Sequence, residues 1–221
     1  MIALRGITWL FFDMGGTLND ETEQEKAMVA AARDALVAEG IHVSCDDIYR
    51  LMIDASIAYQ TPHREAFRQL TNSQEQFERV RVASPYPAKL AHLYAGVPEM
   101  LAALSGKYRL GVIANQGAGM EQWLTHLGIH QYFSVFAGSR DVGLAKPDQA
   151  IFRWALDAAG CAPSEAVMIG DRLDNDIYPA KSLGLSTVWV KQGIAAYQTP
   201  KSVDYMPDYT IERITELAKL F

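Results

Sequence analysis

The sequence has few cysteines, no cluster of basic residues and no long hydrophobic segment, and each of these shortages excludes a class of protein. Cys45 and Cys161 are the only cysteines in 221 residues and lie far apart. This excludes a disulfide framework and a CxxC motif, and it favours two reduced, packed thiols. The formal net charge is −6, so nucleic acid is not expected as a partner.

The apolar N-terminal segment is interrupted by Arg5 and ends at Asp13. It is too short for a signal peptide or a membrane span, so we expect a cytoplasmic protein with no membrane partner. The sequence contains no internal repeat and no low-complexity segment. Hydrophobic residues make up 49% of the chain and charged residues 21%, which is typical of a globular protein with a substantial core.

Residues 8–18 combine a short apolar strand with a carboxylate and a tight turn. Aromatic and β-branched residues predict a buried strand, and this strand ends at Asp13. Gly15 and Gly16 follow, which allows the backbone to turn sharply and to approach a ligand closely. A carboxylate at the carboxyl end of a buried strand lies where open α/β sheets bind their ligands.

Helical patterns without strands extend from about residue 20 to residue 85. Helix starts are indicated near Glu21, Ser44, Thr61 and Ser73, each with an acidic first turn, a capping side chain or a following proline. The Ser-Pro-Tyr-Pro sequence of residues 84–87 interrupts this pattern.

From Val97 onward, short apolar runs alternate with helical patterns. Strands are expected at residues 109–114, 134–137, 166–169 and 186–190, and helices at residues 98–104, 119–127, 148–159, 175–183 and 211–220. Such alternation predicts an α/β fold whose parallel sheet is covered by helices on both faces. We therefore predict a core of residues 1–18 and 90–221 with an all-helical insertion of residues 19–89.

Two further segments carry charged residues close to predicted strand or helix ends. Lys146 lies in a loop before a predicted helix, where a cation would neutralise nearby negative charge and keep Asp13 ionised. The alternative is an ordinary surface lysine.

Asp171, Asp174 and Asp176 follow a predicted strand that ends in Gly170. Carboxylates this close together repel one another unless a cation lies among them, and oxygen ligands of this kind suit Mg²⁺. The alternative is a solvated acidic loop that caps the next helix, a role that fits Asp174 better than metal binding.

In their order along the chain, these segments resemble the motifs of the haloacid dehalogenase-like (HAD) hydrolase superfamily. The resemblance rests on Asp13-Met14-Gly15-Gly16-Thr17-Leu18, on the strand that ends at Ala114-Asn115, on Lys146-Pro147 with Phe152, and on Gly170-Asp171 through Asp176 with Ala180 and Gly184. It covers essentially the whole chain. It implies a Rossmann-like core with a helical cap inserted after the first strand.

The resemblance also implies residue roles. Asp13 would be the nucleophile that forms an aspartyl-phosphate, and Lys146 would hold the phosphate and the charge of the nucleophile. Mg²⁺ would be bound by Asp13, the Gly15 carbonyl and Asp171, with Asp176 supporting the metal or Lys146. The phosphate-binding set implied by the loops comprises Met14 through its N–H, Gly16, Thr17, Asn115, Gln116 and Lys146.

Two positions depart from the family pattern. Most phosphatases of the family have a general acid/base Asp where this chain has Gly15, and its loss typically costs about 10²–10⁴-fold in rate. The second family motif normally ends in Ser or Thr, whose hydroxyl binds a phosphoryl oxygen, and Ala114 occupies that position here. Asn115, Gln116 and main-chain N–H groups are left to bind the phosphate.

The sequence therefore predicts an enzyme, a Mg²⁺-dependent HAD-like phosphatase of small phosphate monoesters that is slowed by Gly15. The alternatives are a HAD-like protein with non-phosphatase chemistry, or one that binds or regulates without turnover. The identity of the small phosphorylated metabolite stays open, because residues of the cap would determine substrate specificity. The candidates for this role are His63, Arg64, Arg68, Tyr86 and Lys89. The oligomeric state is also open, a homodimer included.

Overall fold

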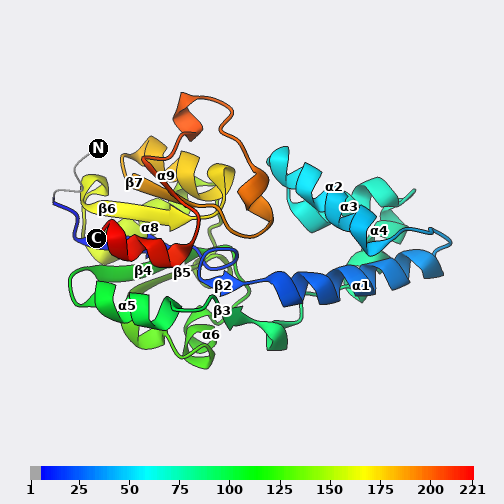
Figure 1. Ribbon diagram of the computed structural model, residues 1–221, viewed down its shortest axis with the longest axis horizontal. Coiled ribbons are helices and arrows are strands. Elements are labelled where there is room, and N and C mark those ends of the chain that lie inside the picture. The colour runs from blue at the N-terminus through cyan, green and yellow to red at the C-terminus, as the bar shows by residue number, and fades with distance from the viewer. Residues whose placement is uncertain (1–5) are drawn as a thin grey trace. The chain divides into compact units, whose positions relative to one another are not determined.

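The structure, a computed structural model, describes residues 6–221; Arg5 and the start of the predicted core lie outside the described residues. The chain divides into two compact units (Figure 1). The core unit comprises the described part of residues 1–19 together with residues 93–192 and 199–221. The helical unit comprises residues 20–92 and 193–198.

The core unit is built on a six-stranded parallel sheet in the order β5-β4-β1-β6-β7-β8. The strands are β1 (Trp9–Phe12), β4 (Arg109–Ala114), β5 (Phe133–Gly138), β6 (Ala166–Gly170), β7 (Ser186–Val190) and β8 (Tyr209–Ile211). All four residues of β1 are buried, because this strand lies between β4 and β6. The predicted α/β fold with a parallel sheet is thus confirmed.

Helices cover both faces of this sheet. Leu10 and Phe12 pack into an apolar cluster with α5 (Val97–Ser105) and α6 (Met120–His126). Trp9 and Phe11 point to the opposite face and pack in a second cluster with α8 (Gln149–Ala159). This alternation follows from the period of two of a strand. The helices of the core unit are α5 (Val97–Ser105), α6 (Met120–His126), α7 (Ser139–Val142), α8 (Gln149–Ala159) and α9 (Tyr178–Leu183).

Four helices form the helical unit: α1 (Thr22–Ala38), α2 (Cys45–Ile57), α3 (Pro62–Leu70) and α4 (Gln74–Ala83). Their apolar stripes meet in a cluster that includes Met28, Ile48 and Phe67. Ser44 caps α2 in a capping box with Asp47. At the start of α4, the Ser73-x-x-Gln76 spacing predicts a capping box, which is only half present. Ser73 accepts the N–H of Gln76, but the Gln76 side chain accepts the N–H of Asn72.

Residues 193–198 belong to the helical unit, whereas the predicted boundaries placed them in the core. Within that unit, the side chain of Gln198 donates to the Ser56 carbonyl (2.9 Å), and Ile194 packs against the apolar cluster. The segment is six residues long and has no periodic pattern, so its sequence carries no signal for this assignment.

The predicted C-terminal helix of residues 211–220 is wrong. The chain forms β8, which pairs with β7, and then a 3₁₀-helix at Ile214–Lys219. Ile211, Ile214 and Leu217 are spaced by three, which is the period of a 3₁₀-helix as well as one of the spacings of an α-helix.

A short two-stranded pairing of β2 (Asn19–Asp20) and β3 (His92–Leu93) was also missed. The chain passes from the core unit into the helical unit within β2 and returns within β3. Within residues 6–221, the structure has no helix with the length and apolar character that a membrane crossing requires.

Candidate active site

The site begins where two neighbouring strands end. β1 and β6 are paired in register, with Phe12 opposite Ile169, and the N–H of Asp13 donates to the Ile169 carbonyl (2.9 Å). Asp13 and Asp171 are the residues that come just after these strands. Parallel strands bring their carboxyl ends to one edge of the sheet, so the two carboxylates lie close together.

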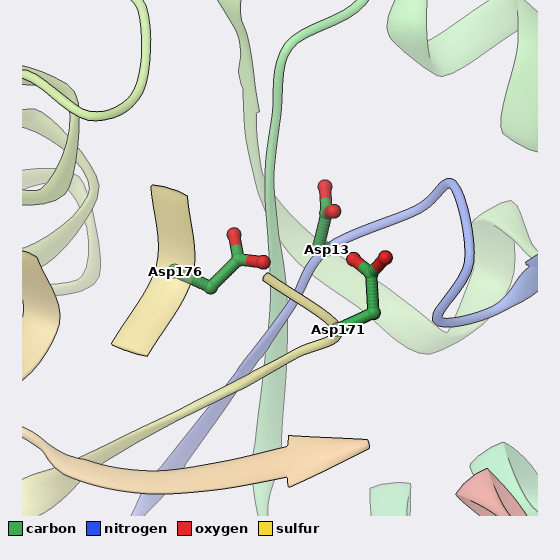
Figure 2. Close-up of side chains that lie close together, drawn as sticks. All are labelled: Asp13, Asp171 and Asp176. Atoms are coloured by element: carbon green, nitrogen blue, oxygen red, sulfur yellow. The ribbon is translucent and has the colours of Figure 1, made fainter. Parts of the chain in front are cut away.

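Three carboxylates meet at this edge. Asp13, Asp171 and Asp176 each offer an oxygen atom, and these atoms all lie within 4.8 Å of one another. Figure 2 shows the three side chains directed toward a common region, Asp13 from the loop after β1, and Asp171 and Asp176 from the segment after β6. The structure thus brings Asp13 together with two acids that lie 158 and 163 positions after it in the sequence.

Lys146 lies between two of these acids. Its Nζ is 2.7 Å from Asp13 Oδ1 and 2.5 Å from Asp176 Oδ1, and its side chain is only 2% exposed. The alternative of an ordinary surface lysine is therefore excluded. Burial alone would lower the pKa of Lys146, but the charges of Asp13 and Asp176 outweigh it and raise that pKa. The ammonium form is the stable one.

Asp176 is fully buried and forms an ion pair with Lys146. Burial raises the pKa of Asp176, and the charge of Lys146 acts in the opposite direction. Besides the contact with Lys146, its Oδ2 accepts the N–H of Arg172 (3.0 Å). Both of its oxygens therefore have partners within the protein, and of its two implied roles the geometry favours the support of Lys146.

A π-helical turn at Leu173–Ile177 presents Asp176 to the site. The carbonyl of Arg172 accepts N–H groups from both Asp176 (2.9 Å) and Ile177 (3.2 Å), which is the widened pattern of a π-helix. The predicted helix of residues 175–183 begins in this turn and continues as α9. Asp174 is no solvated cap: its carboxylate forms an ion pair with Arg172 (2.5 Å).

Asn115 holds the main chain of Lys146 on both sides. Its side-chain oxygen accepts the N–H of Lys146 and its amide donates to the Lys146 carbonyl, both at 2.8 Å. Asn115 thus fixes the start of the lysine side chain, a role that differs from the phosphate contact implied by the sequence. The next residue, Gln116, is fixed by Ser139, whose hydroxyl accepts its N–H (3.0 Å) and donates to its carbonyl (3.1 Å).

Two glycines allow the acids to approach the neighbouring main chain. Gly16 has a φ of +67°, and a Cβ at this position would lie 2.5 Å from Asp171 Oδ2. At Gly170, a Cβ would clash with the carboxylate of Asp176. Any larger residue would displace the acid, so both glycines are needed for the observed arrangement.

The loop after β1 is closed by its own main chain. The Met14 carbonyl accepts the N–H groups of Thr17, Leu18 and Asn19, and the N–H of Gly16 donates to the Asn19 carbonyl (3.0 Å). Gly15 forms a bridge with Asn19 in the same loop. The hydroxyl of Thr17 is buried and has no hydrogen-bond partner among the described residues.

The cap residues singled out from the sequence lie in the helical unit. The His63 ring contacts the rings of Phe67 and Tyr86 in T-shaped geometry, at 6.2 and 5.9 Å between centroids. Burial lowers the pKa of His63 to about 4, so this ring is neutral at pH 7. Arg68 pairs with Glu65 (3.1 Å).

Glu25 in α1 is a titratable residue that sequence reasoning missed. Burial raises the pKa of Glu25 to about 7, the hydrogen bond with Tyr86 opposes this rise, and the charge of Asp20 adds to it. The folded protein therefore binds this proton more tightly than the unfolded chain does. As the pH rises from about 4.5 to 7, the unfolded chain loses the proton first, and folding becomes less favourable.

We expect Glu25→Gln to raise the free energy of unfolding at pH 8 by about 1–3 kcal/mol and to have no such effect at pH 4. The reason is that glutamine removes the cost of a partly buried charge only where the wild-type carboxyl is ionised. Urea unfolding followed by circular dichroism at both pH values measures this difference. Glu23→Gln, at an exposed position of the same helix, is the control and should change stability by less than about 0.5 kcal/mol. A Glu25→Gln variant less stable than wild type at pH 8 would contradict the expectation.

The donor set of the core site fits Mg²⁺. Ligand oxygens about 2.1 Å from a Mg²⁺ ion lie roughly 3 to 4.2 Å from one another, and this cation takes one or two carboxylates with waters and phosphate. The spacing of the Asp13 and Asp171 oxygens, within 4.8 Å, is of this order. The candidate ligands are carboxylate oxygens, with no nitrogen or sulfur ligand among them, and oxygen ligands of this kind favour a hard cation.

Comparison with known proteins places this site in a family. A sequence profile of haloacid dehalogenase-like hydrolases matches residues 10–190, a range that contains every residue of the core site. The chain belongs to the haloacid dehalogenase-like hydrolase family. The family assignment made from the four motifs is thereby confirmed.

Individual HAD relatives match from 75% to 97% of the chain. A glyceraldehyde 3-phosphate phosphatase from Methanopyrus kandleri is 29% identical over 94% of both chains. A phosphoserine phosphatase from Thermus thermophilus is 31% identical over 75% of this chain and 68% of that protein. Among solved structures, a 2-haloacid dehalogenase from Pseudomonas syringae matches 97% of both chains with a TM-score of 0.62 and 25% identity. The HAD fold is thus shared by proteins named for different reactions, and the site must decide between them.

Proposed function

We propose that this HAD-like hydrolase is a Mg²⁺-dependent phosphatase that cleaves small phosphate monoesters through an aspartyl-phosphate on Asp13. The observation that carries the proposal is the buried ammonium of Lys146, in contact with Asp13 (2.7 Å) and beside two further carboxylates. Three acids around one lysine hold more negative charge than one ammonium offsets. A divalent cation at Asp13 and Asp171 would balance this charge and, when bound, supply a Lewis acid for the phosphoryl oxygens.

In the first step, a carboxylate oxygen of Asp13 attacks the phosphorus atom. The new P–O bond forms as the bond to the ester oxygen breaks, and the leaving alkoxide takes a proton from water. Lys146 neutralises charge on the phosphoryl oxygens and keeps Asp13 ionised. Asn115 contributes indirectly, because it fixes the main chain from which the lysine extends.

In the second step, water attacks the phosphorus atom of the aspartyl-phosphate. The P–O bond to Asp13 breaks, the carboxylate is regenerated, and the proton of the water is released to solvent. Family members with an acid at the position of Gly15 have a side chain for these proton transfers. This chain has none there, so we propose a slow phosphatase.

Small substrates are supported by the names of the relatives, which act on glyceraldehyde 3-phosphate and phosphoserine. These are three-carbon compounds with one phosphate group. Dehalogenation is the weaker candidate, since the acidic set of Asp13, Asp171 and Asp176 favours a cation that attack on carbon does not need.

Phosphate release from a panel of three-carbon and four-carbon phosphate monoesters tests this function. We expect release with Mg²⁺, none with chelator, and none from the Asp13→Asn variant. Release that continues with chelator would reject the Mg²⁺ dependence. If no monoester gives release above the Asp13→Asn variant, the binding or regulatory alternative replaces the proposal.

A further inference from the structure

The indole of Trp189 is hydrogen-bonded to the main chain of Asp171. Trp189 Nε1 donates to the Asp171 carbonyl at 2.6 Å, and both residues are only 6% exposed. The two residues are 18 positions apart in the sequence. Nothing in the HAD motifs points to Trp189, so sequence reasoning missed it.

This contact extends the pairing of β6 with β7 by one residue. The last registered pair of these strands is Gly170 with Trp189, and Asp171 lies just beyond it. Where the pairing of β6 with β7 ends, the side chain of Trp189 donates its N–H to the carbonyl of Asp171, the residue that follows β6. This hydrogen bond holds the main chain of Asp171 against β7.

We propose that Trp189 is a positioning residue, which fixes the main chain of Asp171 so that its carboxylate is held ready for Mg²⁺. The inference rests on the proposed function, since it assigns a metal to Asp171. The carboxylate of Asp171 lies close to Gly16, where a Cβ would come within 2.5 Å of Asp171 Oδ2. Trp189 holds the main chain of Asp171, and Gly16 limits the space around its carboxylate. The carboxylate of Asp171 therefore loses little conformational entropy when it binds the cation.

The geometry of Trp189 suits this task. The strand fixes its Cα, and burial restricts the large indole to one orientation. A buried N–H···O bond is strengthened by the low local dielectric. Partners of metal ligands typically change metal affinity by about 10–100-fold when they are removed.

The test compares Trp189→Phe with a matched control, Trp9→Phe. Phenylalanine keeps an aromatic ring in the core; it removes the N–H donor together with part of the indole volume, and the control shares this loss of volume. Trp9 is equally buried (4% exposed) but lies at the start of β1 and stacks on Phe11. Calorimetric titration with MgCl₂ measures affinity without reference to activity. We expect about tenfold weaker Mg²⁺ binding for Trp189→Phe and unchanged binding for Trp9→Phe.

The kinetic signature separates positioning from general damage. If Trp189 acts only through Asp171, the Mg²⁺ concentration for half-maximal phosphate release rises about tenfold, and kcat at saturating Mg²⁺ stays within about threefold. Equal Mg²⁺ affinity of Trp189→Phe and wild type would overturn the inference. So would a wild-type protein that binds no Mg²⁺. Weaker Mg²⁺ binding by Trp189→Phe without phosphatase activity in any variant would reject the proposed function and leave this inference standing.

A measurement on the wild-type protein covers the case in which Trp189→Phe does not fold. The chain has four tryptophans, so the indole N–H resonance of Trp189 is assigned by elimination from Phe variants of Trp9, Trp123 and Trp154. We expect this resonance to be protected from hydrogen exchange and to shift on addition of MgCl₂. The proposal would be overturned if the indole N–H of Trp189 exchanged freely with solvent and its resonance did not shift on addition of MgCl₂.

Discussion

Lys146→Met is expected to reduce phosphate release by about a hundredfold to a thousandfold and to lower the free energy of unfolding by roughly 3–5 kcal/mol. The loss of activity follows from removing the one cation of the chain that contacts Asp13 within the described residues. The loss of stability has a separate cause. The ammonium lies between Asp13 and Asp176, and its side chain is 2% exposed.

Without Lys146, two carboxylates remain in the protein interior with no charge between them. Asp176 is fully buried and Asp13 is 9% exposed, so solvent screens their repulsion poorly. Methionine fills a similar volume, and the effect therefore reports the missing charge and not a cavity.

Urea unfolding in the presence of chelator and phosphate release in Mg²⁺ measure the two effects. Lys107→Met is the control, because Lys107 is exposed and its side chain donates to the carbonyl of Phe221, far from any carboxylate of the site. This variant should stay within about 0.5 kcal/mol of wild type. A Lys146→Met protein that is as stable as the control would show that the pair contributes nothing. Retained activity would remove Lys146 from the proposed reaction.

Gly15→Asp is expected to raise the rate of phosphate release by about 10²–10⁴-fold. The substitution supplies the acid/base group that most phosphatases of the resembled family have at this position. Gly15 tolerates a side chain better than its neighbour, because Gly16 has a positive φ whereas Gly15 does not. In its protonated form, the new Asp side chain would donate a proton to the leaving oxygen in the first step, and the carboxylate so formed would take a proton from water in the second.

Gly15→Asn is the matched control, with nearly the same size and no proton to transfer. Steady-state kinetics with the best substrate of the panel compare the two variants, and the gain should be confined to Gly15→Asp. The double variant with Asp13→Asn should release no phosphate. Equal rates for wild type, Gly15→Asp and Gly15→Asn would contradict the idea that proton transfer limits this enzyme.

Local patterns in the sequence were enough to predict the α/β core and most of its elements. The strand of residues 109–114 has the observed bounds, and Gly160 and Gly184 lie at the predicted helix ends in left-handed conformation. Such features depend on neighbouring residues: apolar runs, capping side chains and glycines with positive φ. Where the local pattern fits two structures, as in the spacing of three near the C-terminus, the prediction was wrong.

By itself, the sequence determined the family, the α/β core and the order of the charged motifs, since each is carried by adjacent residues. Only the tertiary structure decided that Lys146 is buried between two acids, that Asn115 holds its main chain, and that Trp189 reaches Asp171. It alone assigned residues 193–198 to the helical unit, through a hydrogen bond that spans 142 positions. These contacts join residues far apart in the chain, and they form only when the sheet and the helices have packed.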